Sequence, residues 1–190
     1  MFSGGEAFNF SYLNQASKKQ ENSTHHSFQN KYITLEALIQ QLYDCSYQLI
    51  HYGENGKPIY ANEYMALSSE VDRLSARLFT YTPRNQLEEA LLCLVLLMSY
   101  AASCTGSFSQ KENKVNLVLN RTYALLEGTD PRWPTPYPDG TLRCQLTVYT
   151  YTFTNDEDLR KEAQRLISSW QGRNLTQDEV EIIDLFNQLI

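Results

Sequence analysis

The sequence predicts an all-α fold, a compact bundle of about six or seven helices. Apolar residues recur every three or four positions in several segments, which places them on one face of a helix. The segment Ala90–Met98 is instead apolar at every position. A helix that is apolar on nearly every side belongs at the centre of a bundle, buried by its neighbours.

A third observation is the segment Glu162–Ile183, which contains two helices and the stop between them. Its first half repeats apolar residues at helical spacing, and Gly172 then stands where a left-handed residue ends a helix. Thr176 and Glu179, three residues apart, match the capping box that opens a helix. The segment therefore predicts an αα-hairpin.

The first helix is expected to begin at Thr34 and to bury a face of leucine and isoleucine residues up to Leu49. A turn with two glycines follows over 51–58. Asn62 is the expected cap of the second helix, whose apolar residues recur at spacings of three and four up to Leu78. This narrow apolar stripe predicts packing against a neighbouring helix.

Thr82 and Pro83 match a helix cap followed by proline at the first helical position, which predicts the start of the third helix. We expect this helix to continue through 87–102 and to stop near Gly106. The fourth helix is expected from about Lys111 to Leu126, with valine and leucine on its buried face.

Four prolines between Gly128 and Gly140 predict a loop, because proline cannot sit inside a regular helix. The loop also contains Trp133 and Tyr137. We expect these aromatic side chains to pack the loop locally against the surface of the bundle.

The segment Thr141–Phe153 is ambiguous. Its β-branched and aromatic residues favour a strand, whereas Leu142, Leu146 and Tyr149 follow a helical spacing. An isolated strand is not stable, and the sequence offers no partner strand nearby. The segment is therefore interpreted as a helix, and Asn155 is expected to cap the helix that follows.

Residues 1–30 are rich in Ser, Asn, Gln and Gly and predict a flexible polar tail. Such a segment buries too little apolar surface to offset the entropy lost on ordering. Residues 31–190 are expected to form a single helical domain, in keeping with a chain of 190 residues.

The formal charge of −6 argues against a broad phosphate-binding surface and favours a basic protein as partner. Four cysteines without C-x-x-C spacing predict reduced thiols in a cytoplasmic protein. No secretory signal pattern is present, and the longest apolar run falls short of the roughly 20 residues that span a bilayer. We therefore expect no membrane association.

No catalytic site is predicted. His25 and His26 lie in the polar tail, and His51 stands in a turn without an acid or nucleophile beside it in the sequence. Glu88 and Glu89 are adjacent, so on a helix they point about 100° apart. No glycine-rich phosphate loop and no metal-ligand spacing occur. We expect no catalytic residues, no cofactor and no metal ligands.

Four segments, taken in order, resemble the UpxZ family of transcription antitermination antagonists, small bacterial proteins encoded in capsular polysaccharide loci. They are YGENGKPIYANEYMALSSEV, LEEALLCLVLLMSYAA, LRCQLTVYTYTF and EAQRLISSWQGRNLTQDE. The resemblance covers about Thr34–Ile183. The run Trp170–Thr176 is moderately specific, and the order of the four segments is more specific than any one of them.

The resemblance implies an all-α regulator that acts by stoichiometric binding and not by catalysis. Proteins of this family oppose the NusG-like antiterminators, of UpxY type, of non-cognate capsule loci. Those antiterminators keep RNA polymerase elongating through a leader region. The implied partner is therefore such an antiterminator, alone or on RNA polymerase, with no direct contact to nucleic acid.

Two features depart from the family pattern. The proline-containing loop Gly128–Gly140 stands where the family has a shorter leucine-rich link, and the tail before Lys31 is longer. Either difference bears on which antiterminator is recognised, so target specificity is not carried over.

Five residues are predicted to contact the partner, and four of them also have a structural alternative. Trp170 and Arg173 pair an aromatic with an arginine, as interface hot spots do, although a helix end alone explains both. Asp178 and Glu179 belong to an acidic patch that fits a basic partner or complements the helix dipole. Arg143 lies beside the tyrosine-rich segment, and both residue types are enriched at interfaces.

Two other function classes stay open on the residues alone. One is a helical scaffold module in an unrelated assembly. The other is a protein that binds leader RNA by stacking bases on the tyrosines of 147–153. The second is weaker, because that segment contains no lysine or arginine to follow the phosphates.

Overall fold

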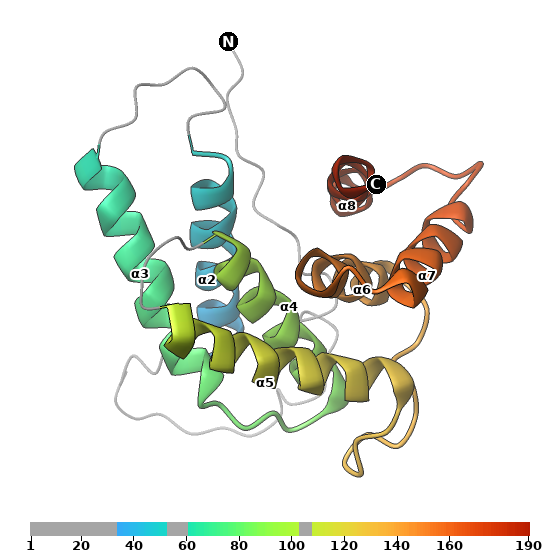
Figure 1. Cartoon of the computed structure of the whole chain (residues 1–190), viewed down its shortest axis with the longest axis horizontal. Coiled ribbons are helices and arrows are strands. Elements are labelled where there is room, and N and C mark those ends of the chain that lie inside the picture. Colours follow the sequence, from blue (N-terminus) through green and yellow to red (C-terminus); the bar gives the residue numbers. More distant parts are fainter. Residues whose placement is uncertain (1–33, 53–60, 103–107) are drawn as a thin grey trace, which may run out of the picture.

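A computed structural model describes residues 34–52, 61–102 and 108–190, and these form seven α-helices and no β-strand (Figure 1). The helices are α2 (Leu35–Ile50), α3 (Ala61–Phe79), α4 (Gln86–Ala102), α5 (Phe108–Glu127), α6 (Thr141–Thr154), α7 (Glu157–Ser168) and α8 (Gln177–Leu189). The all-α prediction is confirmed. The predicted flexible tail, residues 1–30, lies outside the described residues.

Helix α4 lies at the centre of the bundle, as its composition predicts. Every residue of 90–97 is completely buried, and α4 packs against α2, α3, α5 and α6. Burying one large aliphatic side chain stabilises a fold by about 1.5–3 kcal/mol. The apolar run of α4 is therefore the largest local contribution to the core.

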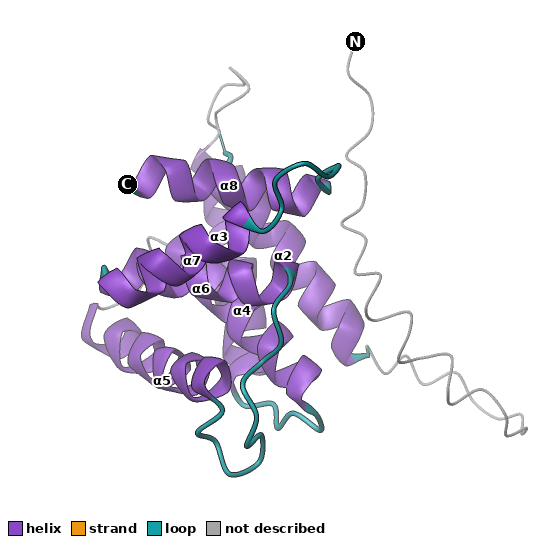
Figure 2. Ribbon diagram, turned by 90° about the vertical axis from the view of Figure 1, so that its right-hand side faces the viewer, coloured by secondary structure: helices purple, strands orange, loops and turns teal. Residues whose placement is uncertain are grey.

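Helix α6, like α4, packs against four other helices. It packs against α4, α5, α7 and α8, so it joins the C-terminal helices to the rest of the bundle. Figure 2 shows α8 and α5 at opposite edges of this half of the molecule, with α6 and α7 between them. The buried apolar side chains of all seven helices form one cluster.

The ambiguous segment is helical, and its threonines explain how. The hydroxyl groups of Thr147, Thr150 and Thr154 each donate to the carbonyl oxygen four residues earlier, at 2.7–3.0 Å. Each threonine hydroxyl is thereby satisfied inside its own helix, even where the side chain is buried. Leu142 and Leu146 meanwhile enter the core. Burial of this face outweighs the strand propensity of the residues.

Two of the predicted helix starts are wrong. Helix α3 begins at Ala61, so Asn62 lies inside the helix and is not its cap. Helix α4 begins at Gln86, three residues after Pro83. Its cap is Asn85, whose side-chain oxygen accepts a hydrogen bond from the backbone N–H of Glu88 at 2.9 Å. Asparagine is preferred over threonine as a helix cap, which agrees with a start of α4 at Asn85 rather than at Thr82.

Asn155 was expected to cap α7, and this is also wrong. Asn155 ends α6 in the left-handed conformation, with φ of 50°, and its N–H donates to the carbonyl of Tyr151 at 2.9 Å. The cap of α7 is the next residue, Asp156, which accepts from the N–H of Asp158. Asparagine tolerates the left-handed region better than most residues, so it ends one helix while aspartate starts the next.

The αα-hairpin is present, with its first helix shorter than predicted. Helix α7 ends at Ser168, and Gly172 closes a further turn with φ of +83°. Thr176 caps α8, and the reciprocal bonds between Thr176 and Glu179 form the predicted capping box. The left-handed glycine and the box together set the angle at which α8 leaves α7.

Candidate partner-binding site

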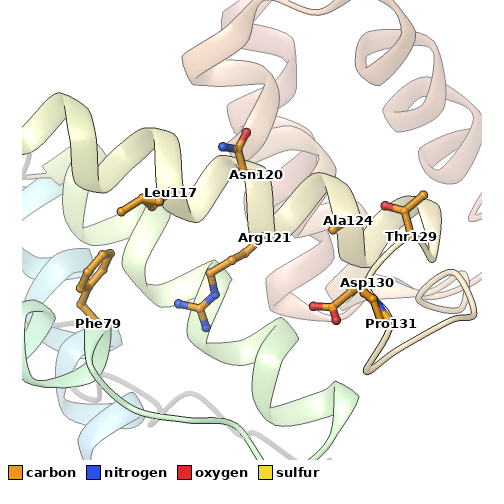
Figure 3. A pocket seen from close by; sticks show the side chains of 8 residues that line it. All are labelled: Phe79, Leu117, Asn120, Arg121, Ala124, Thr129, Asp130 and Pro131. Carbon is orange, nitrogen blue, oxygen red and sulfur yellow. The ribbon is translucent and has the colours of Figure 1, made fainter.

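A shallow hollow of about 510 Å³ runs along α5. Figure 3 shows Phe79 and Leu117 at one end, the proline-containing loop at the other, and Arg121 between them. Leu117 is 54% exposed. The Arg121 guanidinium is held by Glu89, to which it donates two hydrogen bonds of 2.8 Å. The hollow therefore presents apolar surface, and its arginine serves the fold.

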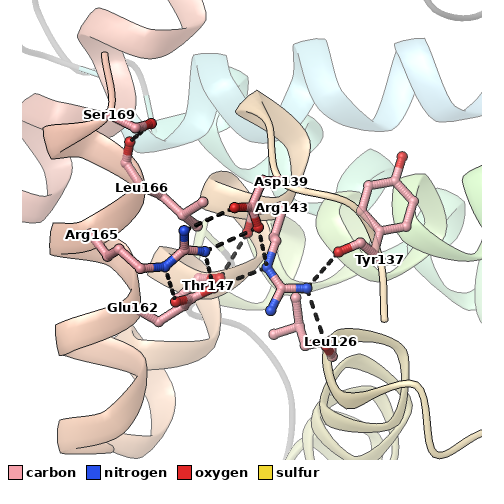
Figure 4. A network of polar contacts seen from close by, with 9 residues as sticks. All are labelled: Leu126, Tyr137, Asp139, Arg143, Thr147, Glu162, Arg165, Leu166 and Ser169. Atoms are coloured by element: carbon pink, nitrogen blue, oxygen red, sulfur yellow. Dashed lines mark hydrogen bonds and ion pairs between the residues drawn. The ribbon is translucent and has the colours of Figure 1, made fainter. Parts of the chain in front are cut away.

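Arg143, a predicted contact residue, fixes the base of the proline-containing loop (Figure 4). Its guanidinium donates to the carbonyl oxygens of Leu126 at 3.1 Å and Tyr137 at 2.5 Å, and to Glu162 at 3.1 Å. Only 14% of its side chain is exposed. The loop starts and ends on α5 and α6, so one arginine ties both ends together.

Arg165 completes this network on the solvent side. It donates to both carboxylate oxygens of Asp139, at 2.8 and 3.0 Å, and to Glu162. These hydrogen bonds hold the pKa of the Asp139 carboxyl below its ordinary value. The loop is therefore attached to α7 as well. Trp133 and Tyr137, which were expected to pack on the surface of the bundle, are partly buried against its core.

Trp170, Arg173 and Glu179 form a second cluster, in the connection between α7 and α8. Trp170 is 5% exposed, and the Arg173 guanidinium lies over its ring at 5.4 Å from the centroid. Arg173 also donates to Glu179 at 2.6 Å, and the hydroxyl of Thr141 donates to the same oxygen at 2.7 Å. The cluster thus joins the start of α6, the turn and the start of α8.

Glu179 is 2% exposed and stays ionised by virtue of its partners. Burial, the largest influence, would raise the pKa of its carboxyl. The hydrogen bonds from Arg173, the N–H of Thr176 and the Thr141 hydroxyl outweigh burial and lower that pKa. Arg173 in turn keeps 44% of its side chain exposed, so it is the accessible member of this cluster.

Asp178, the remaining predicted residue, lines a cavity of about 400 Å³ between α2 and α8. Burial raises the pKa of its carboxyl to about 6, and the nearby charges of Glu181 and Glu179 add to this effect. The cavity walls come from four helices. They are Tyr43, Tyr47 and Ile50 of α2, His51 directly after it, Met98 of α4, Gln145 and Tyr149 of α6, and Gln177, Asp178, Glu181, Ile182, Asp184, Leu185 and Gln188 of α8.

Aromatic rings and carboxylates face each other across this cavity. Tyr43 and Tyr47 stack along α2 with ring centroids 6.3 Å apart, and Tyr47 lies 4.3 Å from the His51 ring. From α8, Glu181 accepts hydrogen bonds from the Tyr47 hydroxyl at 3.4 Å and from Gln177 at 3.0 Å. The described residues of the lining include three carboxylates and neither lysine nor arginine.

Among the predicted contact residues, the structure brings the hairpin residues together and leaves Arg143 apart from them. Asp178 and Glu179 are neighbours on α8, and Glu179 contacts Arg173, whereas Arg143 lies at the loop. Sequence reasoning missed the contribution of α2, because Tyr47 and Glu181 are 134 positions apart. The one usable signal is Tyr149, a tyrosine of the segment 147–153, which lines the cavity.

Within the described residues, no group of three or more His, Cys, Asp or Glu side chains is placed to hold a metal ion. Glu88 and Glu89 point to different arginines, Arg84 and Arg121. Among the helices described, none combines the length and the apolar run needed to cross a bilayer.

Comparisons with known proteins agree on one family. Residues 39–152 match the model of the UpxZ family of transcription anti-terminator antagonists. Among solved structures, a transcription anti-terminator antagonist UpxZ from Bacteroides uniformis ATCC 8492 is 30% identical in sequence. The likeness covers 82% of this chain and 91% of that chain, with a TM-score of 0.69. A comparison with curated proteins found no match.

The family match spans more than half of the chain, and the solved relative shares the fold over most of both chains. The family is one of regulatory proteins and not of enzymes. The chain belongs to the UpxZ family of transcription anti-terminator antagonists.

Proposed function

We propose that this protein binds a NusG-like antiterminator of the UpxY type, encoded by a capsular polysaccharide locus other than its own, and prevents it from acting on RNA polymerase. The observation that carries the proposal is the family match over 39–152, because the family is described by its antagonism of transcription anti-terminators. The action is stoichiometric and takes place in the cytoplasm, where transcription elongates.

We assign the contact to the face formed by α8 and the turn before it. Arg173 and Asp178 reach accessible surface there, whereas Trp170 and Glu179 are buried directly behind them. Arg143 supports the neighbouring loop. The formal charge of −6 favours a basic partner surface, because complementary charges steer association and fix its register.

Calorimetric titration of the full chain into a panel of such antiterminators, at physiological salt, tests the proposal. The expected result is 1:1 binding to some members of the panel and none to the cognate one. Uniform absence of binding by folded protein, with or without RNA polymerase, would contradict it. Affinity for leader RNA that falls steeply with salt would point to the RNA-binding alternative instead.

Arg173→Gln tests the assigned face. Glutamine can still donate a hydrogen bond to Glu179, so the turn is expected to stay folded while the exposed charge is lost. We expect affinity to fall about 5-fold or more, as for an interface arginine. Arg77→Gln is the matched control, because Arg77 is exposed on α3. Equal affinities of both variants would contradict the assignment. Arg173→Glu is unsuitable, because it would place a second carboxylate beside Glu179.

A further inference from the structure

The cavity between α2 and α8 is lined by carboxylates that have no counter-charge among the described residues. Asp178, Glu181 and Asp184 line it, and none of the three forms an ion pair with a described residue. Elsewhere in the described chain, buried or half-buried carboxylates such as Glu89, Glu162 and Glu179 each have an arginine within 3.1 Å. Glu36, Asp44 and Asp156 also lack such an arginine, but the cavity is lined by three carboxylates of this kind on one helix.

A second, independent observation concerns Gln145 of α6. Its side chain lines the same cavity, is 6% exposed, and makes no hydrogen bond to any described residue. Its amide is not among the fully occluded polar atoms, so it remains open to the cavity. A buried amide without a partner is costly and rare in folded proteins. The Gln145 amide therefore offers a donor and an acceptor that no described residue uses to a group entering the cavity.

The third element is aromatic. Tyr43, Tyr47 and Tyr149 contribute their rings to the walls, and a cation over a tyrosine face is attracted by the ring. A planar group that donates several hydrogen bonds in one plane, carries a positive charge and stacks on aromatic rings is a guanidinium. An ammonium group is a compact, strongly hydrated charge, and it stacks on aromatic rings less favourably than a guanidinium does.

We propose that this cavity receives an arginine side chain of the antiterminator, with Glu181 and Asp184 as its counter-charges and the Gln145 carbonyl as a further acceptor. The identity of the partner rests on the function proposed above, whereas the chemistry of the cavity does not. A volume of about 400 Å³ is at the small end of ligand sites and suits one side chain rather than a folded segment. Burial, together with the charges of Glu181 and Glu179, raises the pKa of the Asp178 carboxyl, so a cation in the cavity would have carboxylates to neutralise.

The cavity is tested first without the partner. Full-length ¹⁵N-labelled protein is titrated with N-acetyl-arginine N-methylamide, and the side-chain amide signals of Gln145 are followed by NMR. Gln145→Leu identifies these signals by their loss. Saturable shifts with the arginine compound are expected. Shifts of equal size with the citrulline analogue, which is neutral and of the same shape, or with the lysine analogue would overturn the guanidinium assignment.

Two variants locate the effect. Glu181→Gln combined with Asp184→Asn removes two charges and keeps acceptors for Tyr47 and Gln177, and we expect it to weaken the arginine compound about 10-fold. Asp158→Asn on α7, where the carboxylate side chain is 92% exposed, controls for loss of negative charge and is expected to change nothing. Equal weakening by both would overturn the cavity as the site.

Calorimetry with the antiterminator separates the two proposals. If the double variant binds the antiterminator 10-fold more weakly than the unmodified chain does, the inference is supported. If the antiterminator binds both equally, the inference is wrong and the proposed function stands. If the arginine compound binds the cavity but no antiterminator binds the protein, the assignment of the partner is overturned.

Discussion

Gly128 is the residue at which the proline-containing loop leaves α5, and its replacement by alanine gives a sharp test of the fold. Its φ is +69°, in the left-handed region. A Cβ atom there would lie 2.4 Å from the backbone nitrogen of Pro136 and 2.6 Å from its Cδ atom. Both distances are far shorter than a van der Waals contact, and the nearer atom, the Pro136 nitrogen, belongs to the backbone. The loop must therefore move when Gly128 gains a side chain.

Gly172 offers a matched control. Its φ is +83°, but no atom of the described residues lies within 4 Å of the position of an added Cβ atom. Alanine in the left-handed region costs about 1–2 kcal/mol, and the reduced entropy of the unfolded chain returns about 0.4–1 kcal/mol. Gly172→Ala is therefore expected to lower the free energy of unfolding by about 1 kcal/mol.

Gly128→Ala adds a steric term to that backbone term. Overpacking of this kind costs about 1–3 kcal/mol, so the total loss is expected to be about 2–4 kcal/mol. Urea unfolding followed by far-ultraviolet circular dichroism measures both variants, and fluorescence of Trp133 reports on the loop. Equal losses for the two variants would refute the steric reasoning. A loss in Gly128→Ala below that of Gly172→Ala would refute the placement of the loop.

Three further predictions concern buried titratable groups. Arg121→Met should lower the free energy of unfolding in urea by up to about 3–5 kcal/mol, because it leaves the fully buried Glu89 with only the more distant Arg132, at 3.7 Å; a loss under 1 kcal/mol would contradict this. The pKa of the Asp178 carboxyl is about 6 in the folded chain and about 4 in the unfolded chain. Its ionisation therefore favours the unfolded chain, and the free energy of unfolding falls as pH rises from 4 to 6. Asp178→Asn should therefore be more stable than the unmodified chain at neutral pH, by on the order of 1 kcal/mol after solvent screening, and equal to it below pH 4; urea unfolding at several pH values measures the difference, and a constant difference would be contrary evidence. Burial raises the pKa of the Cys93 and Cys144 thiols to about 12, so iodoacetamide should modify them only after unfolding, and peptide mapping that found them modified in folded protein would exclude this burial.

The two central helices show how much of the fold could be predicted from sequence. The run 90–97 has no polar position, so α4 has no face to offer to water, and burial follows from composition alone. For α6, helical spacing and strand propensity disagreed. The helix prevailed because its leucine face had a core to enter and its threonine hydroxyls bonded within the helix.

Helix ends were predicted where their stabilising contacts are local. Thr176 and Glu179 satisfy each other across three residues, and no other part of the chain is needed. Thr82 and Asn155 failed because several capping residues stood close together in the sequence. The choice among them depends on where the neighbouring helix has to go, and Asn85 and Asp156 were the positions that the packing required.

The residues of the candidate site also differ in whether local sequence or long-range packing determines their role. Composition and motif order determined an acidic, helical chain that resembles anti-terminator antagonists, and they named the hairpin residues Arg173 and Asp178 as candidates for partner contact. Only the tertiary structure decided that Arg143 and Glu179 serve the fold and that α2 and α8 enclose one cavity. The physical reason is range: helical periodicity and capping act over a few residues, whereas Tyr47 and Glu181 meet across 134 positions through the packing of the whole bundle.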